Sequence, residues 1–174
     1  IPIISEEADL PAASIRQAWA HYWLVDPLDG TKEFIARTGE FTVNIALMQN
    51  NIPVLGVVHA PVTDESYVGV DQSVFVDGKS RAEKYVAGKK IADLRTRDIK
   101  ARRDTKHALD VLVSHRHSNS ETEILLQGLQ QQWPVPLNYL KVGSSLKFCW
   151  IAEGRADFYP RLGPTSEWDT AAAQ

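Results

Sequence analysis

The sequence predicts a layered α/β (α+β) sandwich, and two patterns along the chain carry this prediction. Extended apolar runs separated by turn residues fill positions 22–76, as in a sheet of neighbouring strands. After position 110, short apolar runs alternate with segments of helical periodicity, as in layers of strand and helix. The 174 residues are 44% hydrophobic, which supplies a core and excludes a disordered or low-complexity chain.

The first half is expected to form a meandering antiparallel sheet. An apolar stretch with strand character opens the chain at positions 1–4. Turn residues occupy positions 50–53, 60–64 and 77–78, and such short breaks favour hairpins between consecutive strands. We expect strands at 22–26, 41–48, 54–60, 65–70 and 73–76.

The second half is expected to alternate strands with helices. Gly154 stands where a helix would end, because glycine adopts the left-handed conformation that terminates helices. Neither an internal repeat nor a Gly/Ser linker divides the chain, so we expect one unit over 1–174. The expected strands are 111–113, 138–142 and 156–159, and the expected helices are 121–131 and 145–153.

Charge and cysteine content exclude several classes of protein. The formal charge is −3, so no overall positive field recruits nucleic acid. Positions 79–106 hold eleven basic and four acidic residues, but Tyr85 is the one aromatic among them, which is typical of a solvated surface. Docking of this stretch to acidic lipid or nucleic acid stays a minor alternative. The single cysteine, Cys149, excludes an internal disulfide and a CxxC site.

The cellular location is expected to be cytoplasmic. A reducing compartment fits the single cysteine. No apolar run reaches the roughly 18 residues that cross a bilayer, and the start lacks a secretory signal. Peripheral association with the inner face of the membrane is a second option.

The strongest chemical signal is the segment 26–31, in which Asp26 and Asp29 flank a turn through Pro and Gly. Two carboxylates at this spacing can share a hard cation, with the Leu28 carbonyl as a further ligand and Thr31 holding a water. An EF-hand loop is excluded, because its third position is Leu28 and its twelfth is Arg37. An Asx-type turn with two solvated acids is the structural alternative.

Two further acids stand at the ends of expected elements. Glu6 follows the first apolar stretch, and Asp169 stands where an Ala-rich helix would begin. If both converge with Asp26 and Asp29, four like charges would raise one another's pKa values unless divalent cations compensate them. The alternatives are a solvated acidic loop for Glu6 and a helix N-cap for Asp169.

Taken together, segments 5–7, 26–31 and 168–172 resemble the signatures of the inositol monophosphatase superfamily of Mg²⁺-dependent, lithium-sensitive phosphatases. Segments 32–34, 39–47 and 143–149 are similar to those of the CysQ-type 3′(2′),5′-bisphosphate nucleotidases within it. The resemblance implies a layered sandwich of the sugar-phosphatase type. It also implies that the chain is an internal part of that catalytic unit, without the family's N-terminal and C-terminal segments. An upstream Asp that assists Thr31 in activating water would lie in the former.

The resemblance assigns roles to individual residues. It implies two or three Mg²⁺ ions, two of them bridged by Asp26, inhibition by Li⁺, and a water oriented by Glu6 and Thr31. Glu6, Asp26, Asp29 and Thr31 are thereby expected to be catalytic. The implied metal ligands are Glu6, Asp26, the Leu28 carbonyl, Asp29 and Asp169. The implied substrate-binding residues are Glu6, Leu28, Asp29, Gly30, Thr31, His117, Ser145, Lys147, Arg161 and Asp169, of which His117, Ser145, Lys147 and Arg161 serve the nucleotide end.

Structural alternatives stand beside the nucleotide-binding roles. His117 would cap the helix near Ser120, Lys147 would be an exposed helix residue, and Arg161 would pair with a surface acid. The implied reaction is hydrolysis of the 3′-phosphate of adenosine 3′,5′-bisphosphate (PAP) to AMP and phosphate in sulfur assimilation, with PAPS as a second substrate. An inositol or sugar monophosphatase on the same metal site, and a non-catalytic metal- or anion-binding module, are the alternatives. The implied partner is this small nucleotide, and the oligomeric state is left open.

Overall fold

The computed structural model describes residues 1–74, 77–114 and 120–174, which group into two compact units. The first unit comprises Ile1–Asp93, Ser144–Leu146 and Thr165–Gln174, and the second comprises Leu94–Gly143 and Lys147–Pro164. The expectation of a single unit over 1–174 concerns the family's catalytic unit as a whole and stays a prediction.

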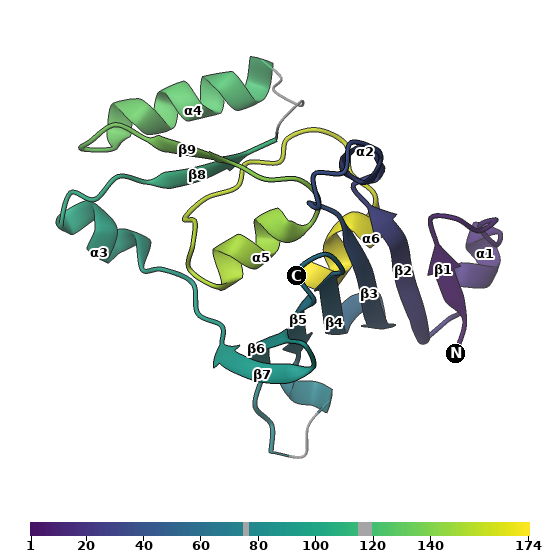
Figure 1. The fold of residues 1–174 in the computed structure, drawn as a ribbon. Coiled ribbons are helices and arrows are strands. Elements are labelled where there is room, and N and C mark those ends of the chain that lie inside the picture. Colours follow the sequence, from purple (N-terminus) through teal and green to yellow (C-terminus); the bar gives the residue numbers. More distant parts are fainter. Residues whose placement is uncertain (75–76, 115–119) are drawn as a thin grey trace. The chain divides into compact units, whose positions relative to one another are not determined.

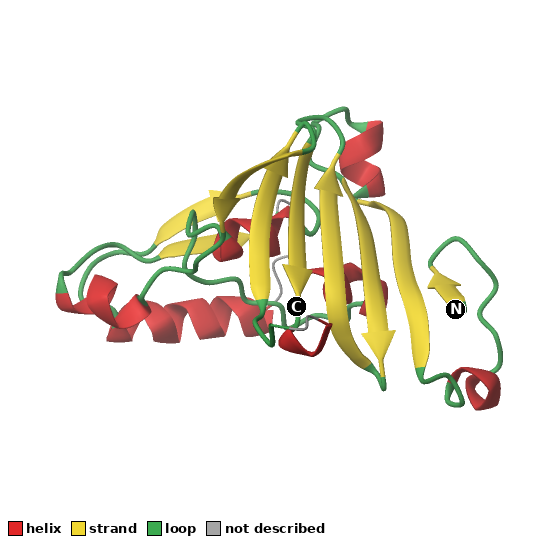
Figure 2. Cartoon of the chain, turned by 90° about the horizontal axis from the view of Figure 1, so that it is seen from below, coloured by secondary structure: helices red, strands yellow, loops and turns green. Residues whose placement is uncertain are grey.

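The first unit is built on a seven-stranded sheet whose strands lie in chain order (Figures 1 and 2). β1 pairs with β2 in parallel, and every later neighbour pairs antiparallel. The predicted meander is therefore confirmed. The strands are β1 (Ile3–Ser5), β2 (His21–Asp29), β3 (Thr42–Gln49), β4 (Ile52–Ala60), β5 (Glu65–Val70), β6 (Arg81–Val86) and β7 (Lys89–Asp93).

Alternation of apolar residues produces the core of this sheet. Every second residue of β3 and β4 is buried, so one face of each strand points into the interior. Asn50 and Asn51 both take positive φ in the β3–β4 hairpin, as the turn chemistry predicts. Across β2 to β5, the buried apolar side chains include Leu24, Ala46, Met48, Val54, Val58 and Tyr67.

Short helices complete the first unit. The 3₁₀ segment η2 (Ala171–Ala173) follows α6 (Glu167–Thr170) and packs on β4 and β3 (Figure 1). Gly56 of β4 makes this packing possible, because a Cβ there would lie 2.1 Å from the carbonyl oxygen of Ala172. The other helices are α1 (Ala13–Arg16), α2 (Thr31–Ile35) and the 3₁₀ segment η1 (Gln72–Val74).

The second unit pairs two parallel strands, β8 (Asp110–Val113) and β9 (Asn138–Lys141). Its helices are α3 (Ile99–Asp104), α4 (Ser120–Gln132) and α5 (Leu146–Ala152), the last beginning at the boundary between the units. Gly154 takes φ +71 after α5, as a helix-ending glycine should. The buried core joins β8 to α4 and its C-terminal loop through Leu109, Val111, Leu126, Trp133 and Leu137.

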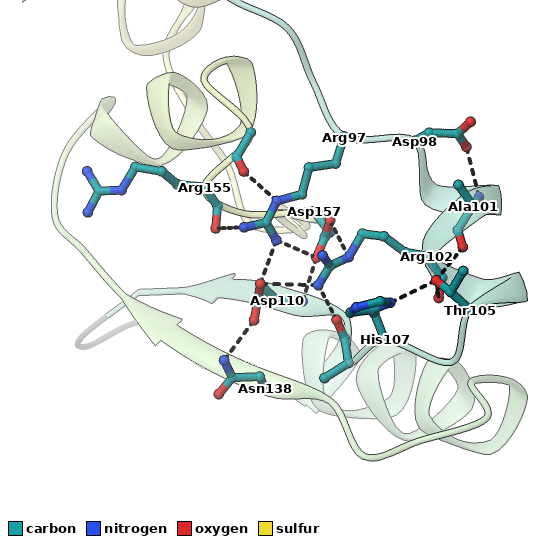
Figure 3. A network of polar contacts seen from close by, with 12 residues as sticks. Arg97, Asp98, Ala101, Arg102, Thr105, His107, Asp110, Asn138, Arg155 and Asp157 are labelled. Carbon is teal, nitrogen blue, oxygen red and sulfur yellow. Dashed lines mark hydrogen bonds and ion pairs between the residues drawn. The ribbon is translucent and has the colours of Figure 1, made fainter.

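A polar network ties the N-terminal part of the second unit to its core (Figure 3). Arg97 bonds Asp110 and Asp157, and it also donates to the carbonyl oxygens of Gly154 and Arg155. Arg102 forms ion pairs with the same two acids at 3.3 and 3.0 Å. The Asp157 side chain is fully buried, so the two arginines compensate a charge that water cannot reach.

Several boundaries differ from the prediction. Residues 72–74 form η1 rather than a strand, and 75–76 lie outside the described residues. The strand expected at 156–159 is reduced to an isolated bridge between Phe158 and Val111. β6 and β7 lie in the basic stretch that was interpreted as solvated surface. The sequence did not reveal these strands, because burial does not alternate from residue to residue along either of them. No described helix has the length and apolar character that crossing a bilayer requires.

Candidate metal centre

Glu6 and Asp26 become neighbours through the parallel pairing of β1 with β2. The register places Ser5 opposite Val25, and the Glu6 amide donates to the Val25 carbonyl at 3.2 Å. Because parallel strands run in the same direction, the residues that follow this pair leave the sheet side by side. The two acids at these positions are therefore brought together by the sheet.

Asp26 is a carboxylate held inside the fold. It is 1% exposed, and its Oδ1 accepts a hydrogen bond from the Leu28 amide at 2.9 Å. Its Oδ2 is buried and has no hydrogen-bond partner among the described residues. A buried carboxylate oxygen without a partner is costly unless a ligand satisfies it.

Asp169 joins this pair from the C-terminal segment. Its Oδ2 accepts from the Thr165 hydroxyl at 3.0 Å and from the Ser166 amide at 3.2 Å, so the two residues that precede α6 fix the direction of the side chain. One carboxylate oxygen from each of Glu6, Asp26 and Asp169 lies within 4.8 Å of the others. The N-cap of α6 is Ser166 and not Asp169, but Asp169 accepts from the Ser166 amide as the N3 residue of a capping box, so its carboxylate also stabilises the start of the helix.

The electrostatics of this cluster favour a cation. The pKa of the Asp26 carboxyl is raised to about 7, mainly by burial and also by the negative charges of Asp29 and Glu6, while the hydrogen bond from the Leu28 amide opposes the rise. Three converging carboxylates with one oxygen unsatisfied are the hard ligands that Mg²⁺ binds. The residues present therefore fit a divalent metal ion, with Glu6, Asp26 and Asp169 as its side-chain ligands.

Asp29 lies at the end of β2, in contact with β3. The strand was predicted to end at Asp26, but it continues to Asp29 through a register shift between the two acids. The Oδ2 of Asp29 accepts from the Ser145 amide and hydroxyl at 2.5 and 2.6 Å. Thr42 and Asn44 donate to the same oxygen at 3.4 Å. The three-acid cluster does not include Asp29, and its role as a metal ligand stays a proposal.

The turn after Asp29 is built on Gly30 and Thr31. Gly30 has φ +95 and caps α2, and its Cα hydrogens lie against Glu40, Phe41 and Ser144. Thr31 is exposed, and its hydroxyl lies 3.5 Å from the Leu28 carbonyl oxygen, the backbone ligand expected from the resemblance. Gly30 directly follows Asp29 as the N-cap of α2, and Thr31 is the first residue of the helix.

The residues expected at the nucleotide end have different surroundings. Lys147 is buried within the second unit, donates to the Val142 carbonyl at 3.3 Å and lies over the Tyr159 ring, so it is not an exposed helix residue. Arg161 is exposed and donates to the Pro164 carbonyl at 3.2 Å. Ser145 is 2% exposed beside Asp29. His117 lies outside the described residues.

Sequence reasoning did not single out Thr42 and Asn44 as site residues. Both are at most 1% exposed, and both bond Asp29 from the interior face of β3. A signal for them was present in the sequence. Thr42 and Asn44 precede Ala46 and Met48 at intervals of two residues, so all four lie on the same buried face of β3. Two polar residues on such a face need partners inside the protein.

Comparison with known proteins gives a consistent answer. The model of the inositol monophosphatase family matches residues 1–174. The chain is 48% identical over 172 residues to the 3′(2′),5′-bisphosphate nucleotidase CysQ of Salmonella typhimurium, which covers 99% of this chain and 61% of that protein. It is 46% identical to CysQ of Escherichia coli with the same coverage. The chain therefore spans about three fifths of the length of these relatives.

Solved structures agree with the predicted fold class. The crystal structure of CysQ from Bacteroides thetaiotaomicron, described as a bacterial member of the inositol monophosphatase family, matches with a TM-score of 0.79 at 37% identity, over 99% of this chain and 63% of that one. Mycobacterium tuberculosis SuhB matches with a TM-score of 0.68 at 22% identity, over 99% and 61%, and supports the fold alone. The sandwich fold and the resemblance read from the motifs are both confirmed: the chain belongs to the inositol monophosphatase family.

Proposed function

We propose that the protein is a Mg²⁺-dependent phosphoric monoester hydrolase that removes the 3′-phosphate of PAP, giving AMP and phosphate. The observation that carries the proposal is the convergence of the Glu6, Asp26 and Asp169 carboxylates, together with the buried Oδ2 of Asp26, which has no hydrogen-bond partner among the described residues. Similarity to CysQ nucleotidases supports the substrate class. Turnover of PAPS, a role in sulfur assimilation and a cytoplasmic location belong to the same proposal.

The chemistry follows from the charges at the site. Bound Mg²⁺ lowers the pKa of a coordinated water and neutralises charge on the phosphoryl oxygens and the leaving group. Glu6, Asp26 and Asp169 would hold the ion, and the proposed set of ligands adds Asp29 and the Leu28 carbonyl. Two or three ions, with Asp26 between two of them, and inhibition by Li⁺ are part of this proposal.

Thr31 and Gly30 have separate roles in the reaction. We assign Thr31, together with Glu6, to orienting the attacking water, because the Thr31 hydroxyl is exposed beside the Leu28 carbonyl. Gly30 brings the backbone close to the scissile phosphate without a side chain in the way. Lys147, Arg161 and His117 are proposed for the nucleotide end, because a second phosphate requires fixed cations.

Phosphate release tests the proposal. The whole chain is given PAP, PAPS or myo-inositol 1-phosphate, each with Mg²⁺, with EDTA, and with Mg²⁺ plus Li⁺. Release from PAP that needs Mg²⁺ and falls with Li⁺ is the expected result. Release from inositol phosphate alone would replace the nucleotidase by an inositol monophosphatase, and Mg²⁺ binding without any release would indicate a binding module.

A substitution separates the two phosphatase activities. Lys147→Met should raise the KM for PAP and leave the Mg²⁺ affinity unchanged, because it removes a cation and keeps the length of the chain. Lys141→Met on β9 is the matched control, since Lys141 is an exposed lysine of the same unit. Equal KM values for the two variants would remove Lys147 from the nucleotide end.

A further inference from the structure

Ser145 lies where three segments that carry the metal centre meet. Its amide and hydroxyl bond Oδ2 of Asp29 at the end of β2. The same hydroxyl oxygen lies 2.9 Å from the Asp169 carbonyl oxygen in α6, and Asn44 of β3 donates to it at 2.8 Å. All four residues belong to the first unit. One buried hydroxyl therefore connects two acids that are 140 positions apart in the sequence.

The one proton of this hydroxyl is already used inside the protein. A serine hydroxyl has one proton to donate and two lone pairs to accept with. The Asn44 amide group donates to it, so its proton is directed to Asp29 or to the Asp169 carbonyl. The carboxylate is the stronger acceptor because it is charged. With 2% of the residue exposed, a phosphate oxygen, which can only accept, could bond this hydroxyl only by replacing the acceptor that now takes its proton.

We propose that Ser145, oriented by Asn44, is a positioning residue of the metal centre and not a contact of the nucleotide. The inference rests on the proposed metal site and reassigns a residue that the family resemblance gives to the substrate. Its amide and hydroxyl hold the Asp29 carboxylate in one orientation, and the hydroxyl oxygen lies against the backbone carbonyl of Asp169, whose side chain belongs to the three-acid cluster. Asn44 is the reason that the proton points toward the acids.

The arrangement also explains the polar face of β3. Asn44 lies opposite Asp26 in the register, and Thr42 lies opposite Asp29. Hydrogen-bond partners that fix the orientation of metal ligands typically contribute 10- to 100-fold to metal affinity. Loss of the Ser145 hydroxyl would leave the Asn44 amide group without this partner and Asp29 with fewer donors.

Mn²⁺ binding to the whole chain without substrate tests the proposal, measured by calorimetry. Ser145→Ala should raise the Mn²⁺ dissociation constant about 10-fold or more, and Asn44→Ala should raise it in the same direction. Ser145→Thr keeps the hydroxyl and should restore most of the affinity. Ser66→Ala is the matched control, because it removes a serine hydroxyl that bonds His59 on β4 of the same sheet.

The KM for PAP at saturating Mg²⁺ gives the second readout. A positioning role predicts a KM within about twofold of wild type for Ser145→Ala, since added metal compensates for the weaker site. Unchanged Mn²⁺ affinity with a raised KM would overturn the inference and make Ser145 a substrate contact. Failure of the wild-type chain to bind Mn²⁺ would overturn the proposed function and this inference together. If Ser145→Ala does not fold, an unchanged Mn²⁺ affinity in Asn44→Ala overturns the inference.

Discussion

Asp26 and Asp29 face the same side of the sheet although three steps along β2 separate them. In a regular strand an odd number of steps places two side chains on opposite faces. The register shift removes this conflict, since Asp26 lies opposite Asn44 and Asp29 opposite Thr42, two steps apart on β3. One extra residue on β2 forms a bulge, and Pro27 is tolerated there because a bulge releases it from the ladder.

Neutralising the buried acid should abolish metal binding without harming the metal-free fold. We expect Asp26→Asn to raise the Mg²⁺ dissociation constant more than about 100-fold, since loss of a ligand exceeds the roughly 10- to 100-fold cost of losing a ligand's partner. Calorimetry measures the affinity, and thermal unfolding in EDTA should show a midpoint no lower than that of wild type. Retained Mg²⁺ affinity would contradict the assignment.

Glu6 and Glu7 provide a comparison between adjacent acids. Glu6 belongs to the three-acid cluster, and Glu7 is an exposed neighbour outside it. Glu6→Gln should weaken Mg²⁺ binding and lower kcat for PAP, whereas Glu7→Gln should change neither by more than about twofold. Equal effects from both variants would mean that only the overall charge of the loop matters.

The stability of the metal-free chain should depend on the ionisation of Asp26. Its pKa is about 7 in the folded state and about 3.9 when unfolded, so the folded state holds the extra proton between these values. This group's contribution to stability is therefore present below pH 4 and lost as pH rises toward 7. In EDTA, urea unfolding should show Asp26→Asn gaining stability relative to wild type from pH 5 to pH 7.5. A constant difference would contradict the raised pKa.

Metal affinity should follow the same ionisation in the opposite sense. Mg²⁺ binds the charged carboxylate, so protons compete with it below pH 7. The Mg²⁺ dissociation constant should rise as pH falls from 7 to 5, up to about 10-fold per pH unit for one competing proton. Titrations at three pH values measure the slope, and a flat profile would exclude Asp26 as the competing group.

Gly56 and Gly69 are cross-strand neighbours with different surroundings. A Cβ at Gly56 would collide with the Ala172 carbonyl, whereas nothing lies within 4 Å of one at Gly69. Gly56→Ala should cost about 2 kcal/mol and weaken Mg²⁺ binding, because η2 must shift and α6 carries Asp169. Gly69→Ala should be neutral or stabilise by about 0.5 kcal/mol. Urea unfolding and calorimetry measure both effects.

The arginine network should support the second unit. Arg97→Met removes its bonds to Asp110 and Asp157 and leaves Arg102 to compensate the buried acid (Figure 3). We expect a loss of about 3 kcal/mol, at the lower end for a broken buried pair, because one arginine remains. Arg103→Met, an exposed neighbour on α3, should stay within about 0.5 kcal/mol. Urea unfolding of both variants measures the two changes in stability.

Prediction of strands and helices from the sequence succeeded where apolar residues follow a regular pattern along the chain. β3, β4 and β5 were predicted from extended apolar runs between turn residues, and α4 was predicted from its helical periodicity. β7 was missed because all five of its residues are exposed, so no period of burial marks it. The bulge in β2 was missed because it is a property of pairing with β3, which one strand's sequence does not contain.

The candidate site also has a part that the sequence predicts and a part that only the fold reveals. Glu6, Asp26 and Asp169 were expected to converge because the motifs that contain them together resemble those of one family. The structure brings the three side chains together. The sequence does not show which oxygen of each carboxylate accepts a hydrogen bond, because some of the donors lie far away along the chain. The role of Ser145 is an example, since its bonds to Asp29 and Asp169 exist only in the folded unit.

The long path of the chain between its metal-binding acids sets the order in which the centre can form during synthesis. Glu6 and Asp26 are made before the second unit, whereas Asp169 follows it and lies in α6, directly before the η2 segment that packs on Gly56. Closing so distant a contact is slow compared with forming hairpins. A nascent chain can thus complete the meander before the three acids are together, so binding of the proposed ion would signal that α6 has been made and has packed on the sheet.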